Sequence, residues 1–382
     1  MNPAELVPAL ALLAVLTREL LWITAVAMMV SNLDDLAVDV LWVAGKLFRR
    51  KHTMPQPGRA GVYAIFVPAW DEAAVIGAML TRLLATLDHP DYTVFVGVYP
   101  NDPETAAAVA AVNDHRVVSV TTDRYGPTTK ADCLNAIWRG MCNHERQHSM
   151  RFDAIILHDA EDVLHPYELR LFDRYMPALA MVQLPVLPLP DPRSRWISGH
   201  YLDDFAQNHA KDMLVRAWLR TPVPSAGVGT AIDRAVLARI AGAGVDPFDA
   251  TSLTEDYEIG QKIHRMGLKG RLIRQRVNGE LVATREYFPD TLEAAVRQKS
   301  RWLTGIALSG WDRLGWQGSR ATRWMLLRDR KGLLTAAIGM IAWAVAVLTV
   351  GQLAVRRLAA ESAGVAMPPL LAPIDIQDSQ EA

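Results

Sequence analysis

Residues 62–72 read VYAIFVPAWDE, an apolar run that is closed by a Pro-Ala-Trp turn and two acids. A helical pattern of apolar residues then continues to Leu87. Similar runs recur as TVFVGVY at 93–99, VVSVT at 117–121 and AIILH at 154–158. An alanine-rich helical stretch follows the second run, and residues 130–141 read as a further helix. Short apolar strands that alternate with helices predict an α/β fold with a mostly parallel sheet covered on both faces.

Acidic residues stand at the ends of three of these runs. In such sheets ligands bind beyond the carboxyl ends of the strands. Three acidic strand ends therefore indicate a site for a cation or a polar ligand. The acids are Asp71 and Glu72, Asp102, and Asp159, Glu161 and Asp162.

Several functional classes are disfavoured. No strand precedes a G-x-x-x-x-G-K-[ST] motif, and Gly227-Val228-Gly229 lacks the third glycine of a dinucleotide fingerprint. Lysine and arginine total 40 against 41 aspartates and glutamates, which argues against a general nucleic-acid binder. The two cysteines, Cys133 and Cys142, are too few for a disulfide framework or a zinc site.

Residues 333–355 are 23 residues without a charge, enough to cross a bilayer core of about 20 helical residues. The N-terminal region is less regular, because Arg18 and Glu19 interrupt the apolar residues 6–30 and Ser31–Asp35 follows. Two arrangements fit: one span over about 20–44 whose acids face a partner helix, or a shorter span followed by an interfacial helix. A cleaved signal peptide is not expected.

Basic clusters border both apolar segments. Arg49, Arg50, Lys51 and Arg59 follow the first, and Arg328, Arg330 and Lys331 precede the second. Because positive residues stay in the cytoplasm, residues 50–331 are expected inside the cell, although Arg356 and Arg357 oppose this. Residues 311–331 carry six basic and two acidic residues among tryptophans and leucines. This pattern is typical of a helix on an anionic membrane surface, or of an ordinary amphipathic surface helix.

Three motifs could carry chemistry. Asp159 and Glu161 can share a divalent cation, although a solvated acidic turn explains them equally well. Thr254-Glu255-Asp256 starts a predicted helix, where Thr254 would otherwise be a simple cap. Gln298, Arg301 and Trp302 have the i, i+3, i+4 spacing of one helix face, which also fits an amphipathic stripe. His158, Gly227 and Gly229 are read as structural residues.

The chain resembles family 2 glycosyltransferases, such as cellulose, chitin and hyaluronan synthases. The resemblance rests on four motifs in this order: a strand-end acid pair, an Asp-x-Asp-like step, T-E-D and Q-x-x-R-W. The chain further resembles the bacteriophage adsorption protein B family, whose members are inner-membrane glycosyltransferases linked to a phage-receptor polysaccharide. That resemblance runs from about Met28 to Gly332. It is carried by VPAWDE (67–72), YPNDPET (99–105), GPTTKADCLN (126–135), HDAEDV (158–163), PSAGVGT (224–230), SLTEDYEIG (252–260), REYFPDT (285–291), RQKSRW (297–302) and RDRKG (328–332).

The resemblance implies a GT-A fold, a Rossmann-like, mostly parallel sheet, flanked by membrane helices. It also implies a Mg²⁺ or Mn²⁺ cofactor and the following residue roles. The catalytic base would be Asp256, and the other catalytic residues would be Glu255 and Asp159. The donor would be bound by Asp71, Glu72, Asp102, Lys130 and Asp159, and the metal would be held by Asp159 and Glu161. The acceptor and the diphosphate would be lined by Gln298, Arg301 and Trp302. The second Asp of the usual metal motif is Glu here, and the PND turn at Asp102 departs from the usual double-Asp loop.

The expected function is an inverting glycosyl transfer from a nucleotide-sugar, a UDP-sugar in the first instance, to a growing surface polysaccharide at the bacterial inner membrane. The alternatives are a non-processive transferase onto a lipid-linked acceptor, or a catalytically silent membrane scaffold for phage adsorption. One C-terminal span cannot enclose a sugar chain, so export would need a partner, a homo-oligomer or segments that this chain lacks. The expected organisation is an N-terminal membrane segment 1–50, a cytoplasmic catalytic domain 51–310, an amphipathic segment 311–332, a transmembrane helix 333–355 and an acidic tail 356–382.

Overall fold

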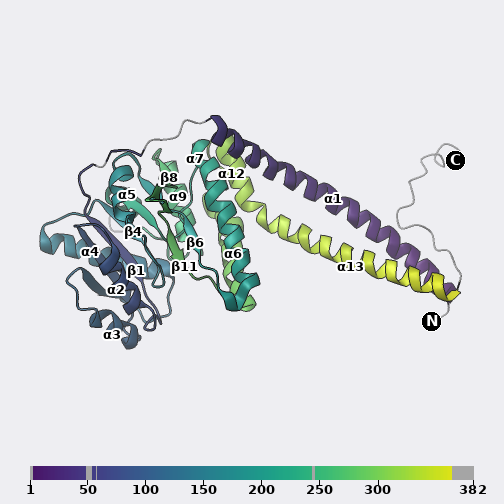
Figure 1. Ribbon diagram of the computed structural model, residues 1–382, viewed down its shortest axis with the longest axis horizontal. Coiled ribbons are helices and arrows are strands. Elements are labelled where there is room, and N and C mark those ends of the chain that lie inside the picture. Colours follow the sequence, from purple (N-terminus) through teal and green to yellow (C-terminus); the bar gives the residue numbers. More distant parts are fainter. Residues whose placement is uncertain (1–2, 49–53, 57, 243–245, 364–382) are drawn as a thin grey trace. The chain divides into compact units, whose positions relative to one another are not determined.

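The computed structural model describes residues 3–48, 54–56, 58–242 and 246–363, which form two compact units (Figure 1). The larger unit is Val38–Arg330, and the smaller one combines the residues up to Ala37 with those from Lys331 onward. The larger unit is longer at both ends than the predicted domain 51–310. The basic residues Arg49, Arg50 and Lys51, and the tail from residue 364, lie outside the described residues.

A seven-stranded sheet is the centre of the larger unit, with strand order β3-β2-β1-β4-β7-β5-β8. Of these strands, β7 alone runs antiparallel to its neighbours. The bounds are β1 Tyr63–Pro68, β2 Tyr92–Val98, β3 Val117–Thr121, β4 Ala154–Leu157, β5 Met181–Gln183, β7 Thr230–Asp233 and β8 Gly270–Leu272. A parallel pair, β6 (Val186–Pro188) with β11 (Thr284–Glu286), and a hairpin of β9 (Arg276–Val277) and β10 (Glu280–Leu281) complete the strands described.

Helices connect and cover these strands. They are α2 Ile76–Thr86, α3 Pro103–Ala111, α4 Lys130–His148, α5 Glu168–Tyr175, α6 Arg195–Gln207, α7 Met213–Trp218, α8 Arg234–Ala241, α9 Glu255–Arg265, α10 Leu292–Leu303, α11 Gly310–Leu314 and α12 Arg320–Arg330. Two π-helical segments, Asn208–Asp212 and Thr304–Ser309, and two short 3₁₀ turns, Met176–Ala178 and Pro192–Ser194, lie between them.

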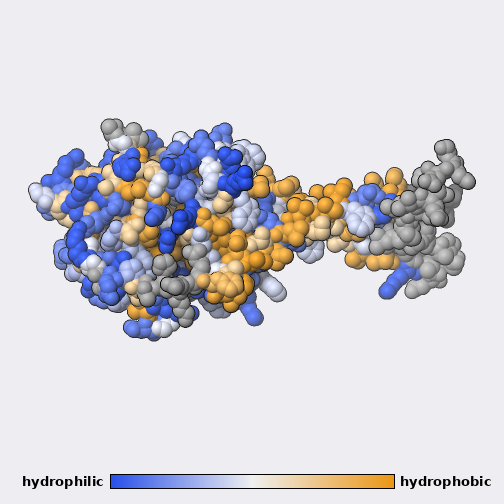
Figure 2. Space-filling model, turned by 90° about the horizontal axis from the view of Figure 1, so that it is seen from above, coloured by the Kyte–Doolittle hydropathy of each residue, from blue (hydrophilic) through white to orange (hydrophobic). Residues whose placement is uncertain are grey.

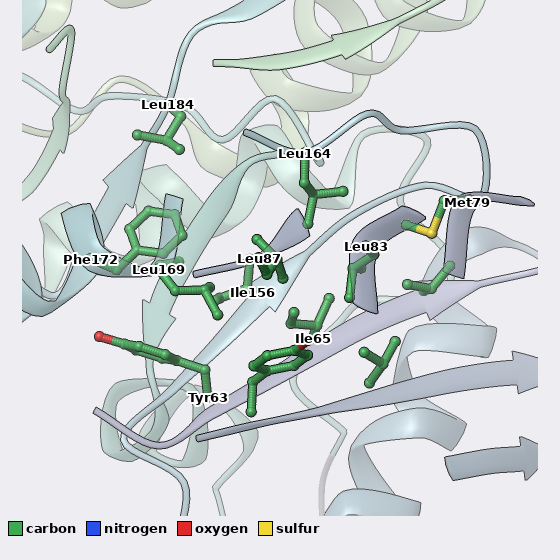
Figure 3. Packing of buried hydrophobic residues seen from close by; sticks show 14 of the residues in the cluster. Tyr63, Ile65, Met79, Leu83, Leu87, Ile156, Leu164, Leu169, Phe172 and Leu184 are labelled. Carbon is green, nitrogen blue, oxygen red and sulfur yellow. The ribbon is translucent and has the colours of Figure 1, made fainter. Parts of the chain in front are cut away.

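The two faces of the sheet bury different clusters because successive strand side chains point to opposite sides. Tyr63 and Ile65 pack on one face with Leu83 of α2 and Phe172 of α5 (Figure 3). Ala64 and Phe66 face the other way, where α4, α8 and α9 supply the packing side chains. Both faces of β1 are therefore buried, as a continuous apolar run requires.

The four predicted strands and the mostly parallel sheet are confirmed. Two helix boundaries differ from the prediction. α4 continues to His148, seven residues beyond the predicted end at Met141. α2 begins at Ile76, whereas the helical pattern in the sequence starts at Glu72. The backbone at Asp71 is left-handed (φ +59°), so the chain turns here before a helix can start.

α1 (Pro3–Phe48) is one unbroken helix whose residues up to Ala37 belong to the smaller unit, and α13 is Gly332–Ala363. Which residues of the continuous helix α1 cross a membrane stays a prediction. Lys331 Nζ lies 2.7 Å from Asp34 and 3.0 Å from Asp35, and Gln352 donates to Thr17 Oγ1 at 2.8 Å. By length and composition, Ala11–Phe48 and Gly332–Val355 are apolar enough to cross a membrane, and their apolar side chains are exposed (Figure 2).

The segment predicted to lie on a membrane surface belongs to the larger unit as far as Arg330. In α12, Met325 and Leu326 are buried, whereas Leu327 is half exposed. Arg330 stacks on Trp316 with 4.2 Å between the guanidinium carbon and the ring centre. This helix packs against the larger unit, and its contact with a membrane stays a prediction.

Candidate active site

A cavity of about 100 Å³ gathers residues from distant parts of the larger unit. They come from the first residue of α4, the loop after β4, α6, the loop before β7, the start of α9, the end of β11 with the chain after it, and the C-terminal half of α10. Seven of the residues predicted from the sequence line it together: Lys130, Asp159, Glu255, Asp256, Gln298, Arg301 and Trp302.

Lys130 links opposite walls of this cavity. Thr129 caps α4, since its hydroxyl accepts from the Asp132 amide at 3.2 Å, and this fixes Lys130 as the first helical residue. The Lys130 ammonium forms an ion pair with Asp159 and lies 3.4 Å from the Gly227 carbonyl oxygen. Burial lowers the pKa of Lys130, but the carboxylates of Asp159 and Glu255 outweigh it and raise the pKa overall. Lys130 is thus a fixed positive charge in the cavity.

Thr254 stands at the N-cap position of α9, but its side chain makes no capping hydrogen bond, so the simple cap interpretation was wrong. Its buried hydroxyl has no hydrogen-bond partner among the described residues. The side chain also packs tightly against the π-helical segment, since a Cβ added to Gly305 would lie 2.5 Å from the Thr254 methyl group. The start of α9 is held instead by Ser252, which donates to Glu258 at 2.7 Å.

Asp256 is the carboxylate at the centre of the arrangement. Its Oδ1 accepts from the Tyr257 amide at 2.7 Å. Burial raises the pKa of Asp256, while Lys130 and Arg301 oppose that rise. Burial and the charge of Asp256 raise the pKa of Glu255 to about 7. An acid with a raised pKa in a cavity has the properties expected of a general base near neutral pH.

Gly227 is required beside Asp256 for two reasons. Its backbone is left-handed (φ +79°), and an added Cβ would lie 2.8 Å from Asp256 Oδ2. Its neighbour Gly229 also has a positive φ, of +57°. These positions agree with the interpretation of both glycines as turn residues.

Gln298, Arg301 and Trp302 share one face of α10 toward the cavity. The Tyr201 hydroxyl donates to Gln298 Oε1 at 2.7 Å. Trp302 meets the ring of Phe205 at 6.3 Å between centres and that of Phe288 at 6.5 Å. Aromatic packing therefore fixes the tryptophan, while Arg301 beside it is exposed and free to meet an anion.

His158 orders the loop that carries the acid pair. It lies fully buried between Asp162, at 2.7 Å, and Glu168, at 2.8 Å. Burial lowers the pKa of His158, but the two acids outweigh it and raise the pKa to about 10. Asp162 also accepts from the Asp159 amide at 3.0 Å, so its hydrogen bonds hold the loop in place. Both ring nitrogens of His158 are occupied, as expected of a structural residue.

Asp159 and Glu161 remain as the acids that could hold a cation. Burial and the charge of Asp159 raise the pKa of Glu161 to about 7. Within the described ranges, no group of three or more His, Cys, Asp or Glu side chains is arranged to hold a metal ion. Mg²⁺ typically takes one or two carboxylates and completes its shell with substrate phosphates and water. The two acids, which repel each other, fit that donor set.

The three other predicted donor residues do not line the cavity. The Asp71 amide donates to Asp102 at 2.7 Å, and Asp102 caps α3 by accepting from the Thr105 amide at 3.2 Å. The Glu72 amide donates to the Thr105 hydroxyl at 2.9 Å. Asp102 therefore shapes the loop that presents Asp71 and Glu72, and any contact of these residues with a donor stays a prediction. Burial and Asp159 raise the pKa of Glu72.

Sequence reasoning missed Glu286, Phe205 and Phe288, which also line the cavity. Burial and the charges of Asp162 and Asp159 hold the pKa of Glu286 well above its ordinary value. The signal available in the sequence was an acid followed directly by two aromatic residues in ATREYF, but β11 has only three residues. Such a short strand shows no alternation from which an inward side chain could be read.

Residues 59–305 match the family model described as glycosyltransferase like family 2, which is more than half of the chain. The chain belongs to this family. This glycosyltransferase is 39% identical over 351 residues to the bacteriophage adsorption protein B of Escherichia coli K12, and equally to the bacteriophage N4 adsorption protein B of Escherichia coli O157:H7. The aligned part covers 83% of the chain and 47% of either relative, so the chain spans about half their length.

Among solved structures, this glycosyltransferase resembles the mannosyltransferase PcManGT of Pyrobaculum calidifontis, solved with GDP-Man and Mn²⁺. The TM-score is 0.58 at 17% identity, over 90% of this chain and 88% of the other. This likeness concerns the fold, and it confirms the predicted GT-A architecture. The predicted resemblance to phage adsorption protein B is likewise confirmed.

Proposed function

We propose that this glycosyltransferase transfers a sugar, with inversion, from a nucleotide-sugar to a glycan at the cytoplasmic face of the bacterial inner membrane. The observation that carries the proposal is the meeting of Asp256, Lys130, Asp159 and Arg301 around one cavity. One carboxylate held between two cations, with a raised pKa, suits a base that acts next to a diphosphate. The two apolar helices support a membrane location.

In this proposal the acceptor hydroxyl attacks the anomeric carbon as its proton passes to Asp256. The bond from that carbon to the diphosphate oxygen breaks, and the nucleoside diphosphate leaves with the electron pair. A single displacement inverts the anomeric centre. Lys130 and Arg301 would stabilise the charge that grows on the departing diphosphate, Arg301 through paired N–H donors.

Asp159 and Glu161 would hold a divalent cation, whose contribution is to neutralise charge on the diphosphate. Lys130 contacts Asp159 here, and that ammonium would turn toward the phosphates when a cation takes its place. Mn²⁺ in the mannosyltransferase structure supports the choice of cation class. We propose a UDP-sugar as the first donor to test and a GDP-sugar, which that mannosyltransferase binds, as the second.

A second cavity, of about 360 Å³, supports an acceptor route to Asp256. It shares Phe205, Ala226, Thr254, Asp256 and Trp302 with the first cavity, and its lining also includes Ile306 and Arg328. An acceptor entering there would reach Asp256 through a cavity that Lys130 does not line. We propose a growing surface polysaccharide as this acceptor, with a partner or a second copy forming any export path. The length of the product separates this proposal from transfer of a single sugar to a lipid-linked acceptor.

Nucleotide release tests the proposal. Membranes that contain the protein would be incubated with a panel of UDP-, GDP- and ADP-sugars and Mg²⁺ or Mn²⁺, beside membranes with the Asp256→Asn variant. We expect metal-dependent release of one nucleotide, lost in the variant. Release from no donor by inserted, folded protein would contradict the proposal and favour a silent scaffold for phage adsorption. If Asp256→Asn releases nucleotide as fast as the wild type, the base assignment is wrong.

A further inference from the structure

A separate cavity of about 440 Å³ lies on the larger unit, away from the active site. Its walls are the chain after α7, the C-terminal part of α9 and the edge strand β8. None of its lining residues also lines the active-site cavity. Its polar side chains are Arg220, Thr221, His264, Lys269 and Arg271.

The lining is strongly basic in a chain whose net charge is −1. Arg220, Lys269 and Arg271 all face this cavity, and the described residues that line it include no acid. In the ranges that the structure describes, these three side chains make no hydrogen bond or ion pair. Other cations of the unit have acidic partners: Arg313, for example, binds both Asp249 and Glu258. Three unmatched cations around one hollow favour an anionic ligand.

The backbone around the cavity is held in place. Arg220 is left-handed (φ +56°), a conformation unfavourable for a side chain with a Cβ, and the Thr221 amide and hydroxyl both bond to the Arg216 carbonyl. A Cβ added to Gly260 would lie 2.3 Å from the Val223 carbonyl oxygen, so α9 packs directly on the chain that follows α7. The cations are therefore presented by a rigid frame, which reduces the entropy cost of binding.

The cavity also lies close to the end of a candidate membrane helix. Trp218, two residues before Arg220, packs against Gly45 in the part of α1 that belongs to this unit. Trp42 in the same stretch donates to the Ala210 carbonyl at 2.9 Å, and Lys46 lies over its ring. Tryptophan and lysine are typical of the membrane–water interface. At this place the abundant anions are lipid phosphates.

We infer that this basic cavity, formed by Arg220, Lys269 and Arg271, binds the phosphate group of a ligand, namely the headgroup of an anionic phospholipid. Its volume exceeds the lower limit of about 300 Å³ of ordinary ligand pockets and leaves room for more than one phosphate. The phosphate group could also come from a soluble phosphate compound, which has the same chemistry. The inference does not depend on the proposed function, because the active-site residues take no part in it.

The test uses the full chain in nanodiscs without divalent cations. Phosphatidylcholine nanodiscs would be compared with ones of increasing phosphatidylglycerol content, and inorganic pyrophosphate would be titrated into the former. The readout is the midpoint temperature of unfolding, which rises when a ligand binds the folded protein. The variant is Lys269→Gln with Arg271→Gln. The control is Arg82→Gln with Arg239→Gln, which removes the same charge from exposed positions on α2 and α8.

We expect phosphatidylglycerol to raise the midpoint in the wild type and the control. In the variant with Lys269→Gln and Arg271→Gln, the phosphatidylglycerol content that gives half of the rise in midpoint temperature should increase about tenfold or more, because two charge-assisted contacts are lost. A rise with pyrophosphate alone, equally sensitive to this variant, would assign the site to a soluble phosphate compound. The inference is overturned if neither probe raises the midpoint, or if variant and control respond alike. Should the double variant not fold, the exposed single change Lys269→Gln repeats the test.

Discussion

In residues 62–164 the candidate site residues stand at the ends of regular strands or at the start of a helix, as Asp159 and Lys130 do. In residues 181–330 they come from elements of a few residues, from a helix next to a π-helical segment, and from aromatic contacts between distant parts of the chain. The first half is built by local regularity, and the second half by long-range packing.

The difference suggests that the two halves have different functions in the reaction. The strand ends of the first half offer acids and a lysine, which suit a phosphate and its cation. The second half offers Asp256, the proposed base, with Arg301 and an aromatic wall, which suit the reacting hydroxyl. If this division holds, substitutions in the two halves should damage different measurable steps.

The largest effect is expected for Asp256→Asn. If Asp256 is the general base, as proposed, its loss should lower kcat by about 10²–10⁴-fold. Binding of the nucleotide-sugar should change little, because asparagine keeps the size of the side chain. Initial rates and a donor-binding titration on the same preparation would check this. A donor affinity that falls as far as kcat would break the proposed division between the halves.

The next effect concerns stability. Asp329 binds Arg216 and accepts from the Tyr257 hydroxyl at 2.7 Å, which ties α12 to the helix that carries Asp256. Asp329→Ala would leave Arg216 buried without its main partner and should lower the free energy of unfolding by about 3–5 kcal/mol. Denaturant unfolding measures it. The exposed pair Glu293–Arg297 is the control, where Glu293→Ala should cost about 0.5 kcal/mol or less. If Asp329→Ala and Glu293→Ala lower the free energy of unfolding equally, the contacts of Asp329 with Arg216 and Tyr257 do not stabilise the fold as proposed.

Asp159→Asn tests the role of the first half, which is expected to bind the cation and the phosphates. Removal of one of the two carboxylates proposed to hold the metal should raise the Mg²⁺ or Mn²⁺ concentration for half-maximal activity by about tenfold or more, because one charged ligand is lost. Saturating metal should restore part of the rate, which it cannot do for Asp256→Asn. A metal titration of both variants separates these results, and an unchanged metal requirement in Asp159→Asn would remove this residue from the proposed cation site.

The smallest effect is on pH dependence. A base must be ionised, so activity falls as the pH drops through the pKa of Asp256, which burial raises. The acid limb of kcat/KM should therefore lie above the ordinary aspartate value of about 4. Arg301 lowers this pKa, so Arg301→Gln should move the limb upward by up to about one pH unit. Arg297→Gln, on the same helix, should leave it unmoved. A limb that shifts downward in Arg301→Gln would refute the electrostatic link.

The sheet and much of the candidate site could be predicted because their signals are local. The strand at 154–158 and the acids after it are contiguous, and the spacing of Gln298, Arg301 and Trp302 places them on one helix face. Tyr201, Phe205 and Glu286 could not be found in this way. Their positions depend on contacts such as Tyr201 with Gln298, which are 97 residues apart in the chain. No pattern within one segment records such a contact.

The pairing of Lys331 with Asp34 and Asp35 has a consequence for synthesis. The two acids leave the ribosome 297 and 296 residues before the lysine that pairs with them. A chain interrupted before residue 331 therefore lacks both ion pairs, so this link within the smaller unit can form only after the whole larger unit has been synthesised.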